Sequence, residues 1–351
     1  MAGLKSQIFR GGLTALWISG GARLASRWTA GKGAVLMLHR VQPTAAERFD
    51  PNAALRITPQ YLERLLGSFR PAGIDIVSLD EALQRVAARG RTRRFVCFTF
   101  DDGYRDNLEH AAPLFERHGA PFTVYATSSF HDRTFAPWWC ALEHVLRAER
   151  TVRWASGAGE LRFDTRSASA KLHAFSTLSR AMMRCPAAEL HALLGRFVRA
   201  HGTSFEELAA RDICSWQELR DLRAAGAAIG CHTVSHAVLA LEPEDSLRRE
   251  LSHARERIEA ELEAPCKHLA YPYGKRDHAG ARELRLAREL GFATAVTTRK
   301  GALHAVHAEH RHAWPRVEVT SSFERSPHYL HAILSGLPLL AWNRGRLSIT
   351  D

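Results

Sequence analysis

The stretch FVCFTFDDGYRDN, from Phe95 to Asn107, places two adjacent acids and a glycine directly after a run of apolar and β-forming residues. The run predicts a buried strand that ends at Asp101 and Asp102. Two neighbouring carboxylates repel each other, and burial raises the free-energy cost of each charge. A polar turn is the simple explanation, because Asp and Gly are common turn residues. A bound cation is the alternative, since its charge offsets the repulsion.

Similar strands recur along the chain and alternate with helical patterns. Strand followed by helix, repeated, predicts right-handed βαβ units and a parallel sheet. About seven or eight strands predict an α/β fold, a (β/α) barrel that is seven-stranded or irregular, with an open doubly wound sheet as the alternative. The predicted strands are residues 34–39, 74–78, 95–100, 122–127, 227–231, 267–274, 292–298 and 314–319.

Helix starts between these strands have recognisable signals. Thr58 followed by Pro59 predicts an N-cap with proline at the first helical position. Ser78 and Ser215 are each followed by Glu three residues later, which predicts capping boxes. These signals support the alternation of strands and helices.

The alternation is interrupted over about residues 140–214, where amphipathic helical stretches occur and no clear strand signal is present. We therefore expect a helical insertion in a barrel domain that spans residues 34–325. A basic, partly apolar leader at residues 1–33 precedes the domain, and an apolar and then basic tail at residues 326–351 follows it.

The net charge of +11 is unevenly placed. No acid precedes Glu47, so the basic residues of the leader have no acidic neighbour in the sequence. Such an imbalance indicates nucleic acid or an anionic membrane as a partner. We expect no nucleic acid, because the basic residues flank apolar runs and no nucleic-acid motif is present. The apolar run at residues 11–22 is too short to span a bilayer, which needs about 20 residues. Packed terminal helices and a peripheral contact with an anionic membrane both remain open.

The six cysteines form no C-x-x-C pair and several lie in apolar contexts. They indicate small core residues in a reducing compartment rather than a disulfide framework. We expect a cytoplasmic protein, with a peripheral position on the inner membrane face if the termini bind lipid.

Polar side chains at strand ends are the candidates for chemistry, because the carboxyl ends of parallel strands meet at one end of the sheet. His232 and His236 follow one predicted strand and lie four residues apart, which places both on one face if the segment is helical. That spacing alone is a weak signal in a chain with 19 histidines. One carboxylate with two imidazoles is nevertheless a ligand set of catalytic zinc sites, and a second carboxylate is then free to act as general base.

Three motifs together point to a family. TFDDG at residues 99–103, HTVSH at residues 232–236 and AYPYG at residues 270–274 occur in this order. They resemble the polysaccharide deacetylases of carbohydrate esterase family 4, which include the nodulation-type chitooligosaccharide deacetylases. The resemblance extends over about residues 34–319.

This resemblance implies a role for each matching position. Asp102, His232 and His236 would bind a divalent metal, Zn²⁺ above all. Asp101 would be the catalytic base, and the backbone N–H of Tyr273 would donate to the oxyanion. The implied activity is removal of the N-acetyl group from a sugar in a polysaccharide, an oligosaccharide or a lipid-linked glycan precursor.

Two departures from the family pattern concern the residues around the base. Ala270 stands where many members have an arginine that orients the base, so we expect Arg316 or Arg105 to take that role. The L-x-x-H pattern that carries the general acid occurs near the N-terminus, at residues 36–39, as in circularly permuted relatives. We therefore expect His39 to be the acid, with His331 as the alternative.

Other residues leave the function open in part. Trp138 and Trp139 would either stack on sugar rings or pack in the core. The histidines near the end of the domain indicate a solvated loop rather than a metal site (His304, His307, His310 and His312). A deformylase or O-deacetylase acting on a lipid-carried sugar is an alternative function. The missing arginine adds another alternative, a non-catalytic glycan-binding relative.

Overall fold

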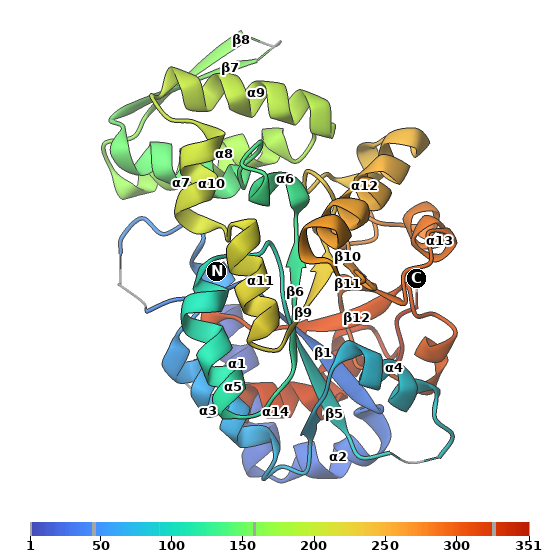
Figure 1. The fold of residues 1–351 in the computed structure, drawn as a ribbon. Helices are drawn as coiled ribbons and strands as arrows, with labels where there is room; N and C mark the ends of the chain where they lie inside the picture. The colour runs from blue at the N-terminus through green and yellow to red at the C-terminus, as the bar shows by residue number, and fades with distance from the viewer. Residues whose placement is uncertain (1, 44–46, 91, 157–158, 325–327, 351) are drawn as a thin grey trace.

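The centre of the molecule is a closed barrel of parallel strands (Figure 1). The computed structural model describes residues 2–43, 47–90, 92–156, 159–324 and 328–350. Eight strands hydrogen-bond in the order β1 (Gly33–Leu38), β12 (Trp314–Glu318), β11 (Thr294–Lys300), β10 (His268–Ala270), β9 (Ala227–Cys231), β6 (Phe122–Ala126), β5 (Phe95–Phe100) and β4 (Asp75–Ile76). Pairing of β1 with β5 closes seven of them into a ring and leaves β4 outside. The prediction of a seven-stranded (β/α) barrel is confirmed, and the open sheet is excluded.

The strand register determines which residues leave the barrel together. Strands β1 and β5 pair from Gly33 with Phe95 to Leu38 with Phe100. His39 and Asp101 therefore emerge side by side at the carboxyl end. Strands β6 and β9 pair up to Ala126 with Cys231, so His232 emerges at the same end.

Helices cover the outside of the barrel. They are α3 (Pro59–Phe69), α4 (Leu79–Ala87), α5 (Ala112–Arg117), α11 (Trp216–Ala224), α12 (Glu244–Leu262) and α13 (Ala281–Glu289). Thr58 caps α3 as predicted. At α4 the Ser78 hydroxyl accepts from the Glu81 N–H at 3.1 Å, but the Glu81 carboxylate bonds to Arg85, so the predicted capping box is found only in part. At α11, Ser215 and Glu218 form a reciprocal capping box.

Shorter elements complete the barrel domain. A parallel pair, β2 (Arg40–Val41) and β3 (Arg56–Ile57), follows β1. The single-turn and irregular helices are η1 (Ala53–Leu55), η2 (Asn107–Ala111), η3 (Leu239–Leu241), η4 (Ala305–Ala308) and η5 (Ser321–Phe323).

An insertion between β6 and β9 lies over the carboxyl end of the barrel (Figure 1). Its helices are α6 (Ser128–His131), α7 (Trp138–Ala148), α8 (Ala168–Met182), α9 (Ala187–Ala200) and α10 (Phe205–Asp212). It also contains an antiparallel hairpin of β7 (Thr151–Ser156) and β8 (Gly159–Asp164), so the prediction that this region lacks strands is wrong. The alternation of buried and exposed residues that indicates a strand extends over only three residues here: Val152 and Trp154 are buried, and Arg153 between them is exposed.

The two ends of the chain pack against each other. They form α1 (Ala2–Ile18), α2 (Gly21–Thr29), α14 (His328–Leu334) and α15 (Leu337–Trp342). Helix α1 packs along α14, and the Thr29 hydroxyl donates to the Ser335 carbonyl at 2.6 Å. The predicted boundary between barrel and tail, at residues 325 and 326, lies outside the described residues. Within the described ranges, no helix combines the length and apolarity needed to cross a membrane.

Candidate active site

A pocket of about 680 Å³ opens at the carboxyl end of the barrel, beneath the insertion. Its floor contains His39, Asp101, Asp102, His232 and His236, which come from the ends of β1, β5 and β9. The structure thus brings together five of the predicted site residues from distant parts of the chain.

Asp102, His232 and His236 form a buried cluster suited to a metal ion. The Asp102 Oδ1 atom lies 3.6 Å from His232 Nε2 and 3.4 Å from His236 Nε2. One ligand atom from each residue lies within 4.8 Å of the others. The Nδ1 atom of His232 bonds to the Ala270 carbonyl at 2.7 Å, which leaves Nε2 directed at the cluster.

The chemistry of this donor set fits a cation. Asp102 Oδ1 is buried and has no hydrogen-bond partner in the described part of the chain. Burial raises the pKa of Asp102, and the Asp101 charge raises it further; the Tyr104 hydrogen bond and the Arg316 charge oppose these effects without reversing them. Burial lowers the pKa of both His232 and His236, which favours the neutral imidazoles that metals bind.

The histidine pair lies on a loop rather than on the expected helix. Thr233 and His236 have φ values of 67° and 56°, in the left-handed region that few side chains adopt. Glu250 of α12 holds the loop by accepting from the N–H groups of Val234 and Ser235 at 3.0 and 2.9 Å. The loop therefore brings the two imidazoles together, as a helical turn would have done. Sequence reasoning missed Glu250.

The turn after β5 separates the two acids. Asp102 and Gly103 have φ values of 75° and 71°. A Cβ atom at Gly103 would lie 2.5 Å from the His131 ring, so only glycine fits there. Strained backbone of this kind is often found at functional sites.

Asp101 has a different partner, Arg316 of β12. The Arg316 Nη1 and Nη2 atoms each donate to one Asp101 oxygen at 2.7 Å. Arg316 is itself fixed by the Thr297 carbonyl at 2.9 Å and the Thr99 hydroxyl at 3.2 Å. Burial alone would raise the pKa of Asp101, but the Arg316 guanidinium outweighs it and holds that pKa well below its ordinary value. Arg316 thus contacts Asp101, and its orienting role stays a prediction.

Arg105, the other predicted candidate for this position, lies elsewhere. Its guanidinium pairs with Glu218 at 2.7 Å on the outer side of the turn, and it does not line the pocket. The prediction that Arg105 orients the base is therefore wrong. Its place in the sequence, three residues after Asp102, gave no indication of which way the side chain turns.

His39 lies beside the base. Its Nε2 atom is 3.9 Å from Asp101 Oδ2, and the Asn107 amide donates to its carbonyl at 2.9 Å. Burial lowers the pKa of His39, and the nearby Asp101 charge opposes that shift. The alternative acid, His331, bonds to Ser68 at 2.9 Å and packs on Trp17 beneath the barrel, outside the pocket.

Tyr273 lines the pocket just after β10. Its φ is 59°, and its N–H donates to no acceptor among the residues the structure describes. The Thr298 hydroxyl donates to its carbonyl at 2.5 Å, and Trp138 Nε1 donates to its phenol oxygen at 2.8 Å. A Cβ atom on Gly274 would lie 2.5 Å from the Thr298 nitrogen, so the next position requires glycine. The backbone at Tyr273 is therefore held rigidly, and its N–H has no acceptor in the described part of the chain.

Comparison with known proteins identifies the fold and the family. The family model described as polysaccharide deacetylase matches residues 88–295, more than half of the chain. The chain belongs to the polysaccharide deacetylase family. The match includes the two acids, the two histidines and Tyr273, whereas His39 and Arg316 lie outside it.

The similar solved structures include proteins that are deacetylases by name. The deacetylase PplD of Streptococcus pyogenes, solved with acetate, is 16% identical with a TM-score of 0.56, and the match covers 85% of this chain and 95% of that one. IcaB from Ammonifex degensii is 18% identical with a TM-score of 0.55, over 87% and 97% of the two chains. The BpsB deacetylase domain from Bordetella bronchiseptica is 16% identical with a TM-score of 0.50, over 82% and 95%. At these identities the structures show a shared barrel fold. No curated protein sequence matched.

As a member of this family the chain is a hydrolase. The non-catalytic alternative rested on the missing arginine at position 270. Arg316 supplies a guanidinium to Asp101 from another strand, which removes that reason.

Trp138 and Trp139 line the pocket from α7, but both are buried. Trp139 Nε1 donates to the Tyr104 phenol at 2.7 Å, and the Trp139 ring contacts the edge of His236 at 4.8 Å between centroids. These contacts favour the packing role over the sugar-stacking role. The two indoles fix Tyr273 and His236 against the insertion.

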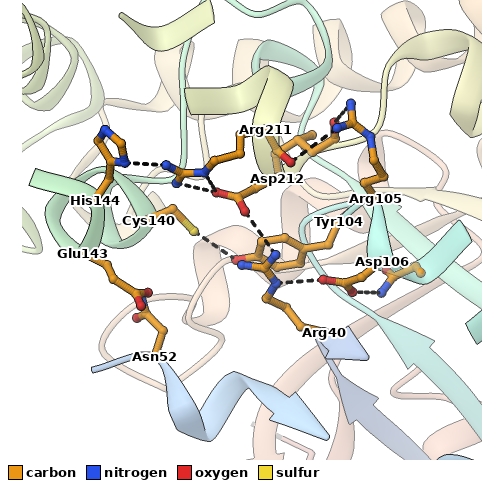
Figure 2. Close-up of polar contacts among 12 residues, drawn as sticks. Arg40, Asn52, Tyr104, Arg105, Asp106, Cys140, Glu143, His144, Arg211 and Asp212 are labelled. Atoms are coloured by element: carbon orange, nitrogen blue, oxygen red, sulfur yellow. Dashed lines mark hydrogen bonds and ion pairs between the residues drawn. The ribbon is translucent and has the colours of Figure 1, made fainter. Parts of the chain in front are cut away.

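A buried polar network next to the site joins the barrel to the insertion (Figure 2). Arg40, the residue after His39, pairs with Asp106 at 2.8 Å and with Asp212 of α10 at 3.1 Å. Its guanidinium lies 4.5 Å from the centre of the Tyr104 ring. Asp106 also accepts from the Val41 N–H at 2.9 Å. The network therefore fixes the backbone directly after His39. Sequence reasoning missed it, although Asp106 lies inside the quoted stretch.

The pocket rim carries further residues that the sequence did not single out. Glu318 of β12, Lys275 and Lys300 line it together with Trp342 of α15. The Lys300 ammonium lies 3.9 Å from the centre of the Trp342 ring. No ion pair joins either ammonium to a described acid. The rim thus carries two ammonium groups, one of which lies on an aromatic ring.

Proposed function

We propose that this hydrolase removes the N-acetyl group from a sugar unit of a polysaccharide, an oligosaccharide or a lipid-linked glycan precursor. The observation that carries the proposal is the division of the two acids between different partners. Asp101 is held by Arg316, while Asp102 faces two imidazoles. One carboxylate is therefore placed to handle a proton and the other to bind a cation.

A divalent metal completes the proposal. Asp102, His232 and His236 would hold it, and a set of one carboxylate and two imidazoles suits Zn²⁺. When bound, the ion would supply a Lewis acid that polarises the amide carbonyl and lowers the pKa of water. The unpaired, buried Asp102 Oδ1 atom supports this part of the proposal.

The side chains around the metal ligands account for the remaining steps. Asp101 accepts a proton from the attacking water as the water oxygen bonds to the acyl carbon. The Tyr273 N–H donates to the carbonyl oxygen as it gains negative charge, an interaction that can contribute about 3–4 kcal/mol. His39 donates a proton to the amide nitrogen as the C–N bond breaks. The products are acetate and a free amino sugar.

The decisive experiment measures acetate release from soluble chitooligosaccharides by the metal-loaded protein. We expect Asp101→Asn to abolish acetate release while metal content stays at the wild-type level, because Asp101 lies outside the ligand set. His236→Ala is the matched comparison and should lose both. Acetate release by Asp101→Asn at the wild-type rate would refute the role of Asp101.

The rim lysines favour a substrate that carries an anionic group beside the acylated sugar, such as the phosphate of a lipid carrier. The ratio of kcat/KM for a sugar phosphate to kcat/KM for its neutral counterpart should fall at least tenfold in Lys275→Met/Lys300→Met. Lys267→Met, which removes a lysine paired with Asp80 away from the pocket, is the control. Product analysis on a lipid-carried sugar distinguishes the alternative function. A deformylase would release formate, and an O-deacetylase would release acetate but leave the amide intact.

We also propose a cytoplasmic location. All six cysteines are unpaired, which supports a reducing compartment (Cys97, Cys140, Cys185, Cys214, Cys231 and Cys266). Thiol titration of the unfolded protein isolated from cells, under conditions that trap free thiols, should therefore recover all six.

A further inference from the structure

Helix α2 exposes a face that the barrel leaves uncovered. Leu24 and Trp28 are 58% and 68% exposed, and Ile18, just before the helix, is 77% exposed. Large apolar side chains gathered at one surface indicate a binding site more often than a solvated one. The deacetylase site does not use this face, since α2 lies beneath the barrel and the insertion lies above it (Figure 1).

The charges on the helix accompany its apolar side chains. Leu24 and Trp28 are four residues apart and form one stripe, and Arg23 and Arg27 form a second stripe beside it. We call these four residues the α2 face. Both arginines are exposed, and neither forms an ion pair with a described acid. The nearest acid in the sequence is Glu47, so the terminal segment carries positive charge alone.

The rest of the fold holds the α2 face in place. Ala22, on another side of the helix, is buried, and the Thr29 hydroxyl bonds to the Ser335 carbonyl. A Cβ atom on Gly336 would lie 1.9 Å from the Thr29 carbonyl oxygen, so α2 and α15 meet in close contact. The helix is therefore presented as a fixed part of the surface.

We propose that the α2 face binds the surface of an anionic lipid bilayer. Tryptophan favours the boundary between headgroups and acyl chains, and arginine beside it attracts anionic headgroups. A short helix with one apolar and one basic stripe lies in the plane of such a boundary rather than across it. The charge complementarity selects an anionic bilayer over a neutral one. The binding does not depend on the deacetylase reaction at the other end of the barrel.

The test is cosedimentation of the full chain with vesicles of phosphatidylcholine alone or with 30% phosphatidylglycerol. The partition coefficient should be at least tenfold higher for the anionic vesicles and should fall as salt rises. Leu24→Ser/Trp28→Ser should lower it at least tenfold, and Arg23→Gln/Arg27→Gln should remove most of the preference for anionic lipid. Leu161→Ser/Leu241→Ser removes two exposed leucines elsewhere and is the matched control.

Each result bears on the proposal directly. Unchanged binding of Leu24→Ser/Trp28→Ser, or equal partition of the wild-type chain into both vesicles, would overturn it. Lipid-free dimerisation that the same double variant abolishes would instead assign the face to a second copy. Melting temperatures of the variants separate loss of binding from loss of fold, and acetate release from soluble substrate separates both from the proposed chemistry.

Discussion

Arg316 of β12 holds Asp101 at the end of β5 through two charge-assisted hydrogen bonds of 2.7 Å, although β1 lies between their strands in the barrel. The contact fixes both the position and the orientation of the carboxylate, because the planar guanidinium donates to both oxygens. Arg316 supplies from β12 the guanidinium that Ala270 on β10 does not provide.

Removal of this contact should disable the base. We expect Arg316→Met to lower kcat at least 100-fold with a smaller effect on KM. The variant leaves Asp101 buried without its cation, so the pKa of Asp101 should rise. Because the base acts when deprotonated, the acid limb of the kcat/KM profile should move to higher pH. Acetate release between pH 4 and 9 measures both effects.

Arg316→Lys is the informative control for that variant. It keeps the positive charge and loses the two-point contact. We expect the acid limb of its kcat/KM profile to lie at nearly the same pH as in the wild type, with kcat still reduced. A methionine variant with the wild-type pH profile would show that Arg316 does not set the charge state of Asp101.

Metal binding should stabilise the fold as well as support activity. Asp102, His232 and His236 form a buried cluster only in the folded chain. A ligand that binds only the folded state adds about 4 kcal/mol of stability at 1,000 times its Kd. We expect chelation to lower the melting temperature and abolish activity, with Zn²⁺ restoring both. The melting temperature of His232→Ala should not respond to Zn²⁺, whereas a full response in that variant would place the metal elsewhere.

The identity of the general acid can be tested by changing the leaving group. His39→Ala should lose most activity on amide substrates, because the amine must be protonated as it departs. The same variant should retain far more activity on an aryl acetate, whose leaving group needs no proton. His331→Ala, which alters a histidine outside the pocket, should resemble the wild type on both substrates.

The Arg40 network should contribute to stability. Arg40→Met leaves Asp106 buried without its cation, whereas Asp212 keeps its ion pair with Arg211; removing one partner of a buried ion pair typically costs about 3–5 kcal/mol. Burial already raises the pKa of Asp106 and Arg40 opposes that shift, so the variant raises the pKa further. An acid whose pKa is raised by folding destabilises the native state as pH increases, so the loss should be larger at pH 8 than at pH 5. Urea denaturation at both values measures it.

A double variant checks that assignment. Arg40→Met/Asp106→Asn removes the charge that the single variant strands, so we expect it to be more stable than Arg40→Met alone. Additive losses would show that the two residues act independently.

The sequence predicted the barrel and the acids for physical reasons. Buried parallel strands are short apolar runs, and the run at residues 95–100 ends in charges that only a strand end can accommodate. Arg316 was foreseen as a partner of Asp101, with Arg105 as the other candidate, because Ala270 stands where the family pattern has an arginine.

The loop that carries the histidines was not foreseen. Thr233 and His236 adopt left-handed backbone without a glycine to signal it, and the stabilising Glu250 is distant in sequence. The Arg40 network joins residues 66 and 172 positions apart, a separation that no local pattern encodes. Burial of Trp138 and Trp139 depends on the insertion that covers them.

Arg316 and Asp101 show that residues of one site can come from different strands of the barrel. Seven strands end around one small volume, so a side chain can reach the same atom from several starting points along the chain. In this molecule the arginine stands on β12, two places around the ring from β10, where AYPYG has alanine. Loss of a motif residue is therefore poor grounds for classifying a barrel of this kind as inactive until the neighbouring strands have been inspected for a substitute.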